Sequence, residues 1–529
     1  MRIASPSALS TAFIASLCAA FTHAAPAFDN DQLVYQTPSA SGFEALTLGL
    51  SSKLSSTFNH VFSHFSRPTA TSQDEGKTIW DVINDSDEFS QLAHILNYSS
   101  DATKDILKKK DDLTLFAPLN WHHHRGGDDD KEAFQDLSFG PASVQQWSQL
   151  QKLISDFERD YGANALHHKG GDDDDDDKKK HRREVIRHLI DAHALYHLVR
   201  SDKRLDSKTI ADNSSVATWL NTGKAHRNND GTDWRVRTGK SLLPLPAIYL
   251  NFYSRVVKPD IRTKNGLIHG IKYPLILPPD VLQSLFFGQT TFSTTTSGLQ
   301  KVHAAQYLSY HPWQGHHGHG HRGGDDKKSF SAYHHESNGT GHNHFPGVPA
   351  ETFFAPTNLA WSRLPFAFRA YLFSPWGYHL LQKIFMLHSL PSDIVYADFV
   401  HHISHSKSAA PQAVHTVEGN GNKTSYTFNS VLPAIDGKKG EFETVDVDVY
   451  RYYLLPGQKG PLQTRMVVQN VSVILQDFPA SNGAWHAIDH FLKPKGHPEK
   501  GIWAEVAEAT EEAGFGSIDL LAEAQAGLW

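Results

Sequence analysis

The chain has 529 residues, of which 39% are hydrophobic, 11% aromatic and 20% charged, and its formal net charge at pH 7 is −7. This length is enough for roughly two to four domains, the aromatic content argues against a wholly disordered chain, and the charge argues against a nucleic-acid-binding protein. Protonation of the 34 histidines would reverse the sign of the net charge, so the charge depends on whether the compartment is neutral or acidic.

The N-terminus has the pattern of a secretory signal peptide, residues 1–24. Arg2 precedes an apolar run over residues 9–21, and small residues at positions 22 and 24 predict cleavage after Ala24. A short buried helix is the alternative interpretation. The single cysteine, Cys18, lies inside this segment, so we expect a mature protein without disulfides. No later stretch reaches the roughly 18 apolar residues of a transmembrane helix, and the acidic C-terminus lacks the hydrophobic tail of a GPI signal.

Residues 25–75 form an N-terminal extension in which apolar residues recur every three or four positions, which predicts an amphipathic helix. These apolar residues are Phe43, Leu46, Leu50, Leu54, Phe58, Val61, Phe62 and Phe65. The polar face holds one basic residue, Lys53, which argues against electrostatic membrane binding. We expect the helix to dock on the domain that follows, with the surface of a partner as the alternative.

The rest of the chain contains an internal repeat, because two motifs occur twice in the same order. The first reads LTLFAPLN at residues 113–120 and ETFFAPTN at residues 351–358. The second begins with Asn-Gly and has a histidine three residues after the glycine; between the motifs, a histidine follows an apolar helical stretch. The motif residues are Phe116, Ala117, Pro118, Asn120, His197, Asn265, Gly266 and His269 in the first copy, and Phe354, Ala355, Pro356, Asn358, His388, Asn482, Gly483, His486 and Asp489 in the second.

These motifs resemble the fasciclin (FAS1) domain, and the arrangement is similar to that of fungal FAS1-domain proteins. The resemblance implies an α+β fold with two FAS1 domains, each a β-sandwich or wedge core with several packed helices, at residues 76–282 and 284–496. Two positions depart from the family pattern: Leu387 stands where the family has tyrosine, and Lys272 where it has aspartate. These departures weaken the expectation that both domains share one ligand.

The motif residues have physical roles that do not depend on the family. Pro118 removes a ladder donor and ends a strand, and Asn120 is placed to cap the next helix. The Asn-Gly pairs are turn dipeptides that tolerate positive φ before a strand. His269 and His486 lie in apolar surroundings, which favours buried histidines that hydrogen-bond across the domain; a catalytic or metal-binding role is the alternative.

Three segments share a composition that runs from histidines through glycines to aspartates and lysines. They are His122–Lys131 and His167–Lys180, in an insertion at about residues 121–181 of the first domain, and His316–Lys328, in one at about residues 311–346 of the second. Because such runs bury little apolar area, we expect mobile loops that arose by low-complexity expansion. The alternative is weak metal binding, by His316, His317, His319 and His321 or, for Ca²⁺, by Asp172–Asp177.

Six Asn-x-Ser/Thr triplets are candidate N-glycosylation sites on the secretory route. They are Asn84, Asn97, Asn213, Asn338, Asn422 and Asn470. Asn470 is the least favourable, because the run MVVQNVSVIL around it is typical of a strand that would bury it in part.

Residues 497–529 form an acidic C-terminal tail. Within it, Ile502, Trp503, Val506 and Ala507 precede a series of acids, and we expect a short docked helix with a frayed end.

The chain lacks the common enzyme motifs, including G-x-S-x-G, H-E-x-x-H and the P-loop. Asp446 and Asp448 alternate with apolar residues, which predicts a strand with one solvated face rather than an acid–base pair. We therefore expect a noncatalytic glycoprotein without a cofactor, which acts in adhesion or in binding a protein, matrix or glycan partner. We rank the vacuolar lumen slightly above the extracellular space. A metal- or pH-responsive lumenal protein is the alternative, and an undetected hydrolase is the third interpretation; the sequence does not assign an oligomeric state.

Overall fold

The structure is a computed structural model that describes residues 76–494 with internal gaps. The gaps are residues 121–138, 163–172, 224–227, 242–246, 311–346, 365, 404–409, 419–420, 435–440, 456 and 458. The predicted signal peptide, the amphipathic helix before residue 76, the histidine-rich segments 122–131 and 316–328, Asn338 and the acidic tail therefore lie outside the described residues.

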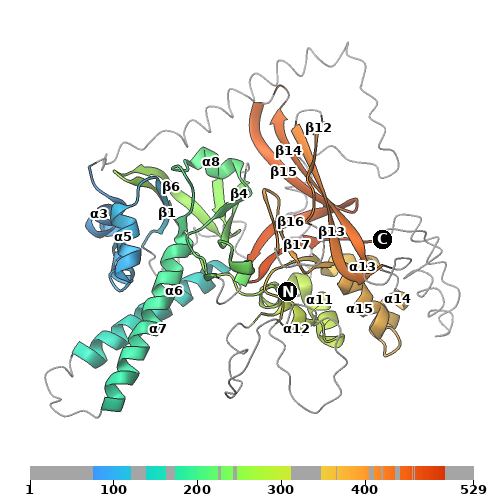
Figure 1. The fold of residues 1–529 in the computed structure, drawn as a ribbon, viewed down its shortest axis with the longest axis horizontal. Coiled ribbons are helices and arrows are strands. Elements are labelled where there is room, and N and C mark those ends of the chain that lie inside the picture. The colour runs from blue at the N-terminus through green and yellow to red at the C-terminus, as the bar shows by residue number, and fades with distance from the viewer. Residues whose placement is uncertain are drawn as a thin grey trace, which may run out of the picture. The chain divides into compact units, whose positions relative to one another are not determined.

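The described residues divide into two compact units, with the break along the chain between Pro279 and Asp280 and the short segment Phe478–Ser481 counted with the first unit. A helix of the second unit begins at Val281 and ends at Phe287. The boundary predicted between residues 282 and 284 therefore falls inside this helix. Each unit combines several helices with one large sheet, so the fold class is α+β (Figure 1).

In the first unit, one sheet with strand order β2-β1-β7-β6-β5-β4-β3 carries the helices. Its helices are α3 (Ile79–Asp85), η1 (Asp87–Phe89), α4 (Ser90–Leu96), α5 (Asp101–Lys109), α6 (Phe139–Gly162), α7 (Asp173–His197), α8 (Ser207–Asp212) and η4 (Asn228–Gly231). Its strands are β1 (Leu113–Pro118), β2 (Leu198–Val199), β3 (Ser215–Ala217), β4 (Arg235–Ser241), β5 (Ala247–Leu250), β6 (Ser254–Arg262) and β7 (Gly266–Ile271).

The first motif forms β1, which lies between β2 and β7 in this sheet. All six residues of β1 are buried, and β1 pairs in parallel with β7, with Leu113 opposite Gly266. Side chains alternate along a strand, so Leu115 joins the apolar cluster formed with the helices, whereas Phe116 joins the cluster on the other face. The motif strand therefore contributes to both cores of the unit.

The insertion in the first unit contains two long helices, α6 and α7 (Figure 1). The expectation of a mobile loop over His167–Lys180 is wrong for its second half, because α7 begins at Asp173. The run of aspartates followed by lysines favours a helix that begins here. On the next turns, Ile186 and Ile190 are buried and join α7 to the apolar core.

In the second unit, an eight-stranded sheet has the order β12-β13-β14-β15-β16-β17-β8-β9, and β10 and β11 form a separate pair. The helices are α10 (Val281–Phe287), α11 (Gln289–Lys301), α12 (Ala305–Leu308), α13 (Asn358–Arg363), α14 (Phe366–Leu372) and α15 (Tyr378–Leu387). The strands are β8 (Glu351–Pro356), β9 (Ser389–Leu390), β10 (Asp393–Tyr396), β11 (Phe399–His402), β12 (Val414–Glu418), β13 (Gly421–Pro433), β14 (Phe442–Leu455), β15 (Lys459–Val468), β16 (Val471–Ala480) and β17 (Gly483–Ile488).

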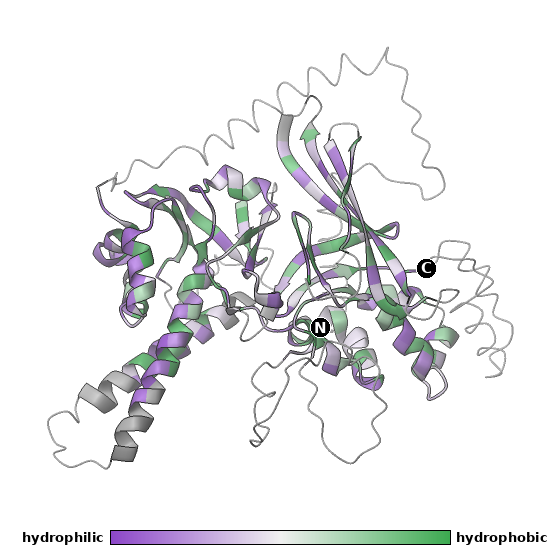
Figure 2. Ribbon diagram, in the orientation of Figure 1, coloured by the Kyte–Doolittle hydropathy of each residue, from purple (hydrophilic) through white to green (hydrophobic). Residues whose placement is uncertain are grey.

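The long strand β14 has one buried and one solvated face, as the alternation of its residues predicts (Figure 2). Val445, Val447 and Val449 are buried. Asp446 and Asp448 lie on the opposite face, where each accepts a hydrogen bond from a hydroxyl of β13 at 2.7 and 2.6 Å. These two carboxylates therefore stabilise strand pairing.

None of the described helices, α6 and α7 included, has the length and apolar character of a transmembrane segment.

Candidate functional site

The asparagine of each Asn-Gly pair is a buried cross-link within its unit. Asn265 accepts a hydrogen bond from the Ile79 backbone at the start of α3, at 2.8 Å, and donates to the Leu107 and Lys110 carbonyls. Asn482 repeats this arrangement: it accepts from Val281 at 3.0 Å and donates to the carbonyls of Leu308 and Val348 and to Glu351 Oε1. In both units this side chain connects the last strand to the first helix.

The glycine of each pair is required by close backbone contact. A Cβ atom on Gly266 would lie 2.4 Å from the Leu113 carbonyl oxygen, and one on Gly483 would lie 1.8 Å from the Glu351 carbonyl oxygen. Gly483 also has a φ of 138°, which side chains rarely tolerate. Glycine therefore allows the closing strand to lie against the first motif strand in each unit.

The asparagine of the first motif caps a helix that precedes it, which corrects the predicted cap of the following helix. Asn120 accepts from the Gln91 backbone at 3.0 Å and donates to the Asp87 carbonyl and the Ser90 hydroxyl, at the start of α4. Asn358 makes the equivalent contacts with Thr290, Ser293 and Thr294 in α11. The helix after the second motif is capped by the Thr357 hydroxyl instead.

His269 and His486 are fully buried and hold a bend in the neighbouring strand. In each, Nδ1 accepts from the backbone N–H of an aspartate with positive φ, Asp260 at 3.2 Å and Asp477 at 3.0 Å. Nε2 then carries the proton and donates to a carbonyl at 2.9 Å. Burial lowers the pKa of both rings, to about 4 for His486, so both are neutral at pH 7.

His197 and His388 are also buried, but they have the opposite tautomer. Nδ1 donates at 2.7 Å to a carbonyl one turn back in the same helix, and Nε2 accepts from the backbone N–H of Leu275 at 2.9 Å or Leu492 at 3.1 Å. Burial lowers the pKa to about 3 for His197 and about 4 for His388. Because both nitrogens of all four motif histidines have backbone partners, the geometry indicates that these side chains stabilise the fold.

Within the part of the chain that the structure describes, no cluster of three or more His, Cys, Asp or Glu residues is arranged to bind a metal.

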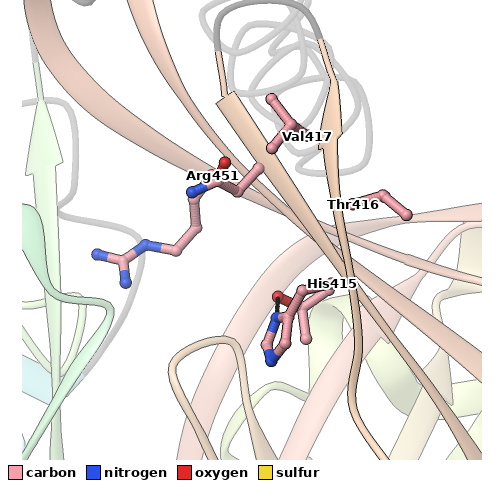
Figure 3. Close-up of a pocket in the computed structure, with 6 residues that line it drawn as sticks. His415, Thr416, Val417 and Arg451 are labelled. Atoms are coloured by element: carbon pink, nitrogen blue, oxygen red, sulfur yellow. Dashed lines mark hydrogen bonds between the residues drawn. The ribbon is translucent and has the colours of Figure 1, made fainter.

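A shallow surface pocket lies on the outer strands of the second unit (Figure 3). Its lining residues are His415, Thr416, Val417, Asn422, Thr424 and Arg451, and its volume is about 380 Å³. Strand pairing places Val417 opposite Asn422, and Asn422 opposite Arg451, so these side chains form a row across β12, β13 and β14. Beside them, His415 and Thr424 are hydrogen-bonded at 3.0 Å.

Strand β12 is the outermost strand of the described sheet, and its residues 414–417 are exposed. Val417 is 83% exposed and Val414 is 58% exposed. This surface was not predicted from the sequence. The available signal was the turn sequence Gly-Asn-Gly at residues 419–421, which separates two short alternating runs and is typical of a hairpin.

The described glycosylation sequons differ in exposure. Asn84, Asn97, Asn422 and Asn470 are exposed, whereas Asn213 is half-buried. The expectation for Asn470 is wrong, because it lies in the turn between β15 and β16 with a φ of 66° rather than inside a strand. Asparagine tolerates this backbone conformation better than most residues, which explains why an apolar run is interrupted here.

Comparisons with known proteins find a family model that matches part of the chain. The model of the fasciclin domain matches residues 349–494. A solved FAS1 domain pair from the insect cell adhesion molecule fasciclin I is similar at 13% sequence identity, with a TM-score of 0.26, over 78% of this chain and 98% of that one. A search of curated proteins finds no match. The match to the fasciclin domain thus covers residues 349–494 of this chain.

Proposed function

We propose that this chain is a noncatalytic glycoprotein of the secretory pathway that acts in adhesion by binding a protein partner. The observation that carries the proposal is the exposed outer strand β12 of the fasciclin domain. Adhesion agrees with the family, and the signal-like N-terminus and the sequons support the secretory route. The vacuolar lumen and the extracellular space are the two locations that we propose.

An outer strand is suited to bind another protein by strand addition. Its outward backbone N–H and C=O groups are available to pair with an extended segment of a partner, and alternate side chains give specificity. Proteins commonly protect such edges with charges or proline, but β12 presents Val414 and Val417 to solvent. Arg451, one strand further in, would interact favourably with an acidic residue of the partner.

The test compares two matched substitutions in the full chain. Beads coated with the Val417→Lys variant should bind less of a native matrix or wall extract than wild-type beads, because a lysine on an outer strand disfavours pairing. Val257→Lys is the control, since Val257 is 48% exposed on the first unit. Equal binding by Val417→Lys, Val257→Lys and wild type would reject the β12 surface. Turnover of glycoside or ester substrates by the purified chain would reject the noncatalytic assignment.

A further inference from the structure

The helices α13, α14 and α15 of the fasciclin domain present two strongly exposed aromatic side chains. Phe366, the first residue of α14, is 77% exposed, and Trp376, in the turn after α14, is 72% exposed. They are the most exposed aromatic residues in the described chain. Helix α14, which begins at Phe366 and ends before Trp376, has seven residues and is about 10 Å long. The two most exposed aromatic side chains of the described chain therefore lie within eleven residues of each other in the sequence, which makes this segment a candidate binding surface.

The same helices are unusually poor in negative charge. From residue 352 to residue 392 the chain contains no aspartate or glutamate, whereas it contains Arg369, Lys383 and Arg363, of which Arg363 is paired with Asp489 at 2.8 Å. The guanidinium of Arg369 lies 5.9 Å from the centre of the Phe366 ring, so positive charge and aromatic surface adjoin on α14. A ligand that is both acidic and apolar would complement this face.

The C-terminal tail leaves the domain beside these helices. Phe491 packs edge-to-face on Trp361 of α13, with ring centres 4.8 Å apart, and the Leu492 backbone donates to His388 at the end of α15. The described chain ends at Pro494. Ile502 follows eight residues later, and an extended segment of that length spans up to about 27 Å. Phe366 follows Trp361 by five residues, which span at most about 18 Å, so the tail is long enough to reach α14.

The tail has the complementary composition. After Lys500 it contains six acids and no lysine or arginine: Glu505, Glu508, Glu511, Glu512, Asp519 and Glu523. At helical spacing, Ile502 and Val506 fall on one side and Glu508 and Glu511 on the opposite side, with Glu505 and Glu512 at the border. Trp503 lies next to the apolar side and offers an aromatic ring to an aromatic surface.

We propose that the α13–α15 face binds the acidic tail of the same chain, residues 501–529, as an amphipathic helix. The apolar side of the tail would cover Phe366 and Trp376, and its acids would lie near Arg369. An anionic membrane or a second copy of the chain are other occupants of such a face, and the experiment distinguishes them. The proposal is independent of the β12 surface, because that surface consists of different residues.

The test measures the distance between α14 and the tail in the full chain. Spin labels are attached at Ala370→Cys, an exposed position of α14, and at Thr510→Cys, with Cys18→Ser as background. We expect a short, narrow distance distribution in dilute protein. Arg369→Glu should broaden it about twofold or more, and adding lysines at Glu508, Glu511 and Glu512 should restore it, because the charges are then exchanged. Phe366→Ala should also broaden it, whereas Phe287→Ala, at another exposed phenylalanine of the unit, should not.

Three results would overturn the proposal. A broad distribution in the wild-type chain would show that the tail is not docked. A narrow distribution that appears only with rising protein concentration would identify a second copy as the occupant. A tail distance that changes only on addition of vesicles containing phosphatidylserine would identify an anionic membrane as the ligand of this face.

Discussion

Acidification from pH 7 to pH 5 should destabilise both units through their buried histidines. The pKa of His388 and His486 in the folded state is about 4, and that of His197 is about 3, against 6.5 for an ordinary histidine. Between these values the unfolded chain binds protons that the folded chain excludes, so the free energy of unfolding falls as the pH falls. Protonation would also remove the ring lone pair that accepts a backbone hydrogen bond.

The magnitude follows from the pKa difference. At pH 5, each histidine with a folded pKa near 4 and an unfolded pKa of 6.5 lowers the free energy of unfolding by about 2 kcal/mol relative to pH 7. His388 and His486 together therefore remove about 4 kcal/mol from the second unit, out of roughly 5–15 kcal/mol for a typical domain. The buried carboxyl of Glu351 acts in the opposite direction, because burial holds its pKa well above the usual range.

Denaturant unfolding at pH 7, 6 and 5 measures this loss directly. The variant His388→Asn should be less stable at pH 7, because a buried backbone hydrogen bond is lost, but its further loss on going to pH 5 should be about 2 kcal/mol smaller than in wild type. His379→Asn is the matched control, since His379 is exposed on the same helix. The reasoning is refuted if the unfolding free energy is constant between pH 7 and pH 5, or if His388→Asn and His379→Asn have the same pH dependence.

Three other substitutions or sites test the structure. Glu351→Gln mimics the neutral carboxyl, so it should raise the free energy of unfolding of the second unit at pH 7. The decrease in this free energy between pH 7 and pH 5, measured from the same denaturation curves, should then be larger than in wild type. Gly483→Ala should cost about 3 kcal/mol or more in unfolding free energy, because a Cβ would overlap the neighbouring strand, whereas Gly76→Ala, where nothing lies within 4 Å, should leave the melting temperature nearly unchanged. In glycopeptide mass spectrometry of protein from a secreting host, we expect higher occupancy at the exposed Asn470 than at the half-buried Asn213; the reverse order would contradict the exposure argument.

Much of the repeated framework could be predicted from the sequence, because it depends on local patterns. The alternation around Asp446 and Asp448 predicts which face of β14 is solvated, and the Asn-Gly pairs mark the starts of β7 and β17. The direction in which Asn120 acts could not be predicted. Its partner helix lies about 30 residues earlier, and a side chain that caps across the domain leaves no signature in the residues next to it.

The start of α7 and the β12 surface were missed for different reasons. Composition alone predicts disorder for the run Asp172–Asp177. The lysines that follow the aspartates favour a helix instead, and α7 begins at Asp173. The β12 surface depends on the order of strands in the sheet, and the sequence does not state that β12 is outermost. The row formed by Val417, Asn422 and Arg451 exists only once three strands have paired in register.

The hydrogen bonds of Asn265 and Asn482 determine how much of the chain must be synthesised before each unit can complete its fold. Asn265 joins residues 186 positions apart, and Asn482 joins residues 201 positions apart, so neither unit can complete its contacts until its last strand has left the ribosome. The closing strand of the first unit nevertheless ends at Ile271, before the second unit begins at Asp280. Apart from the segment Phe478–Ser481, the first unit is complete in sequence at Pro279, so this part can fold while the second unit is still being translated. A chain that ends before residue 265 would have a first unit in which α3 lacks the Asn265 hydrogen bond and β1 lacks its parallel partner β7.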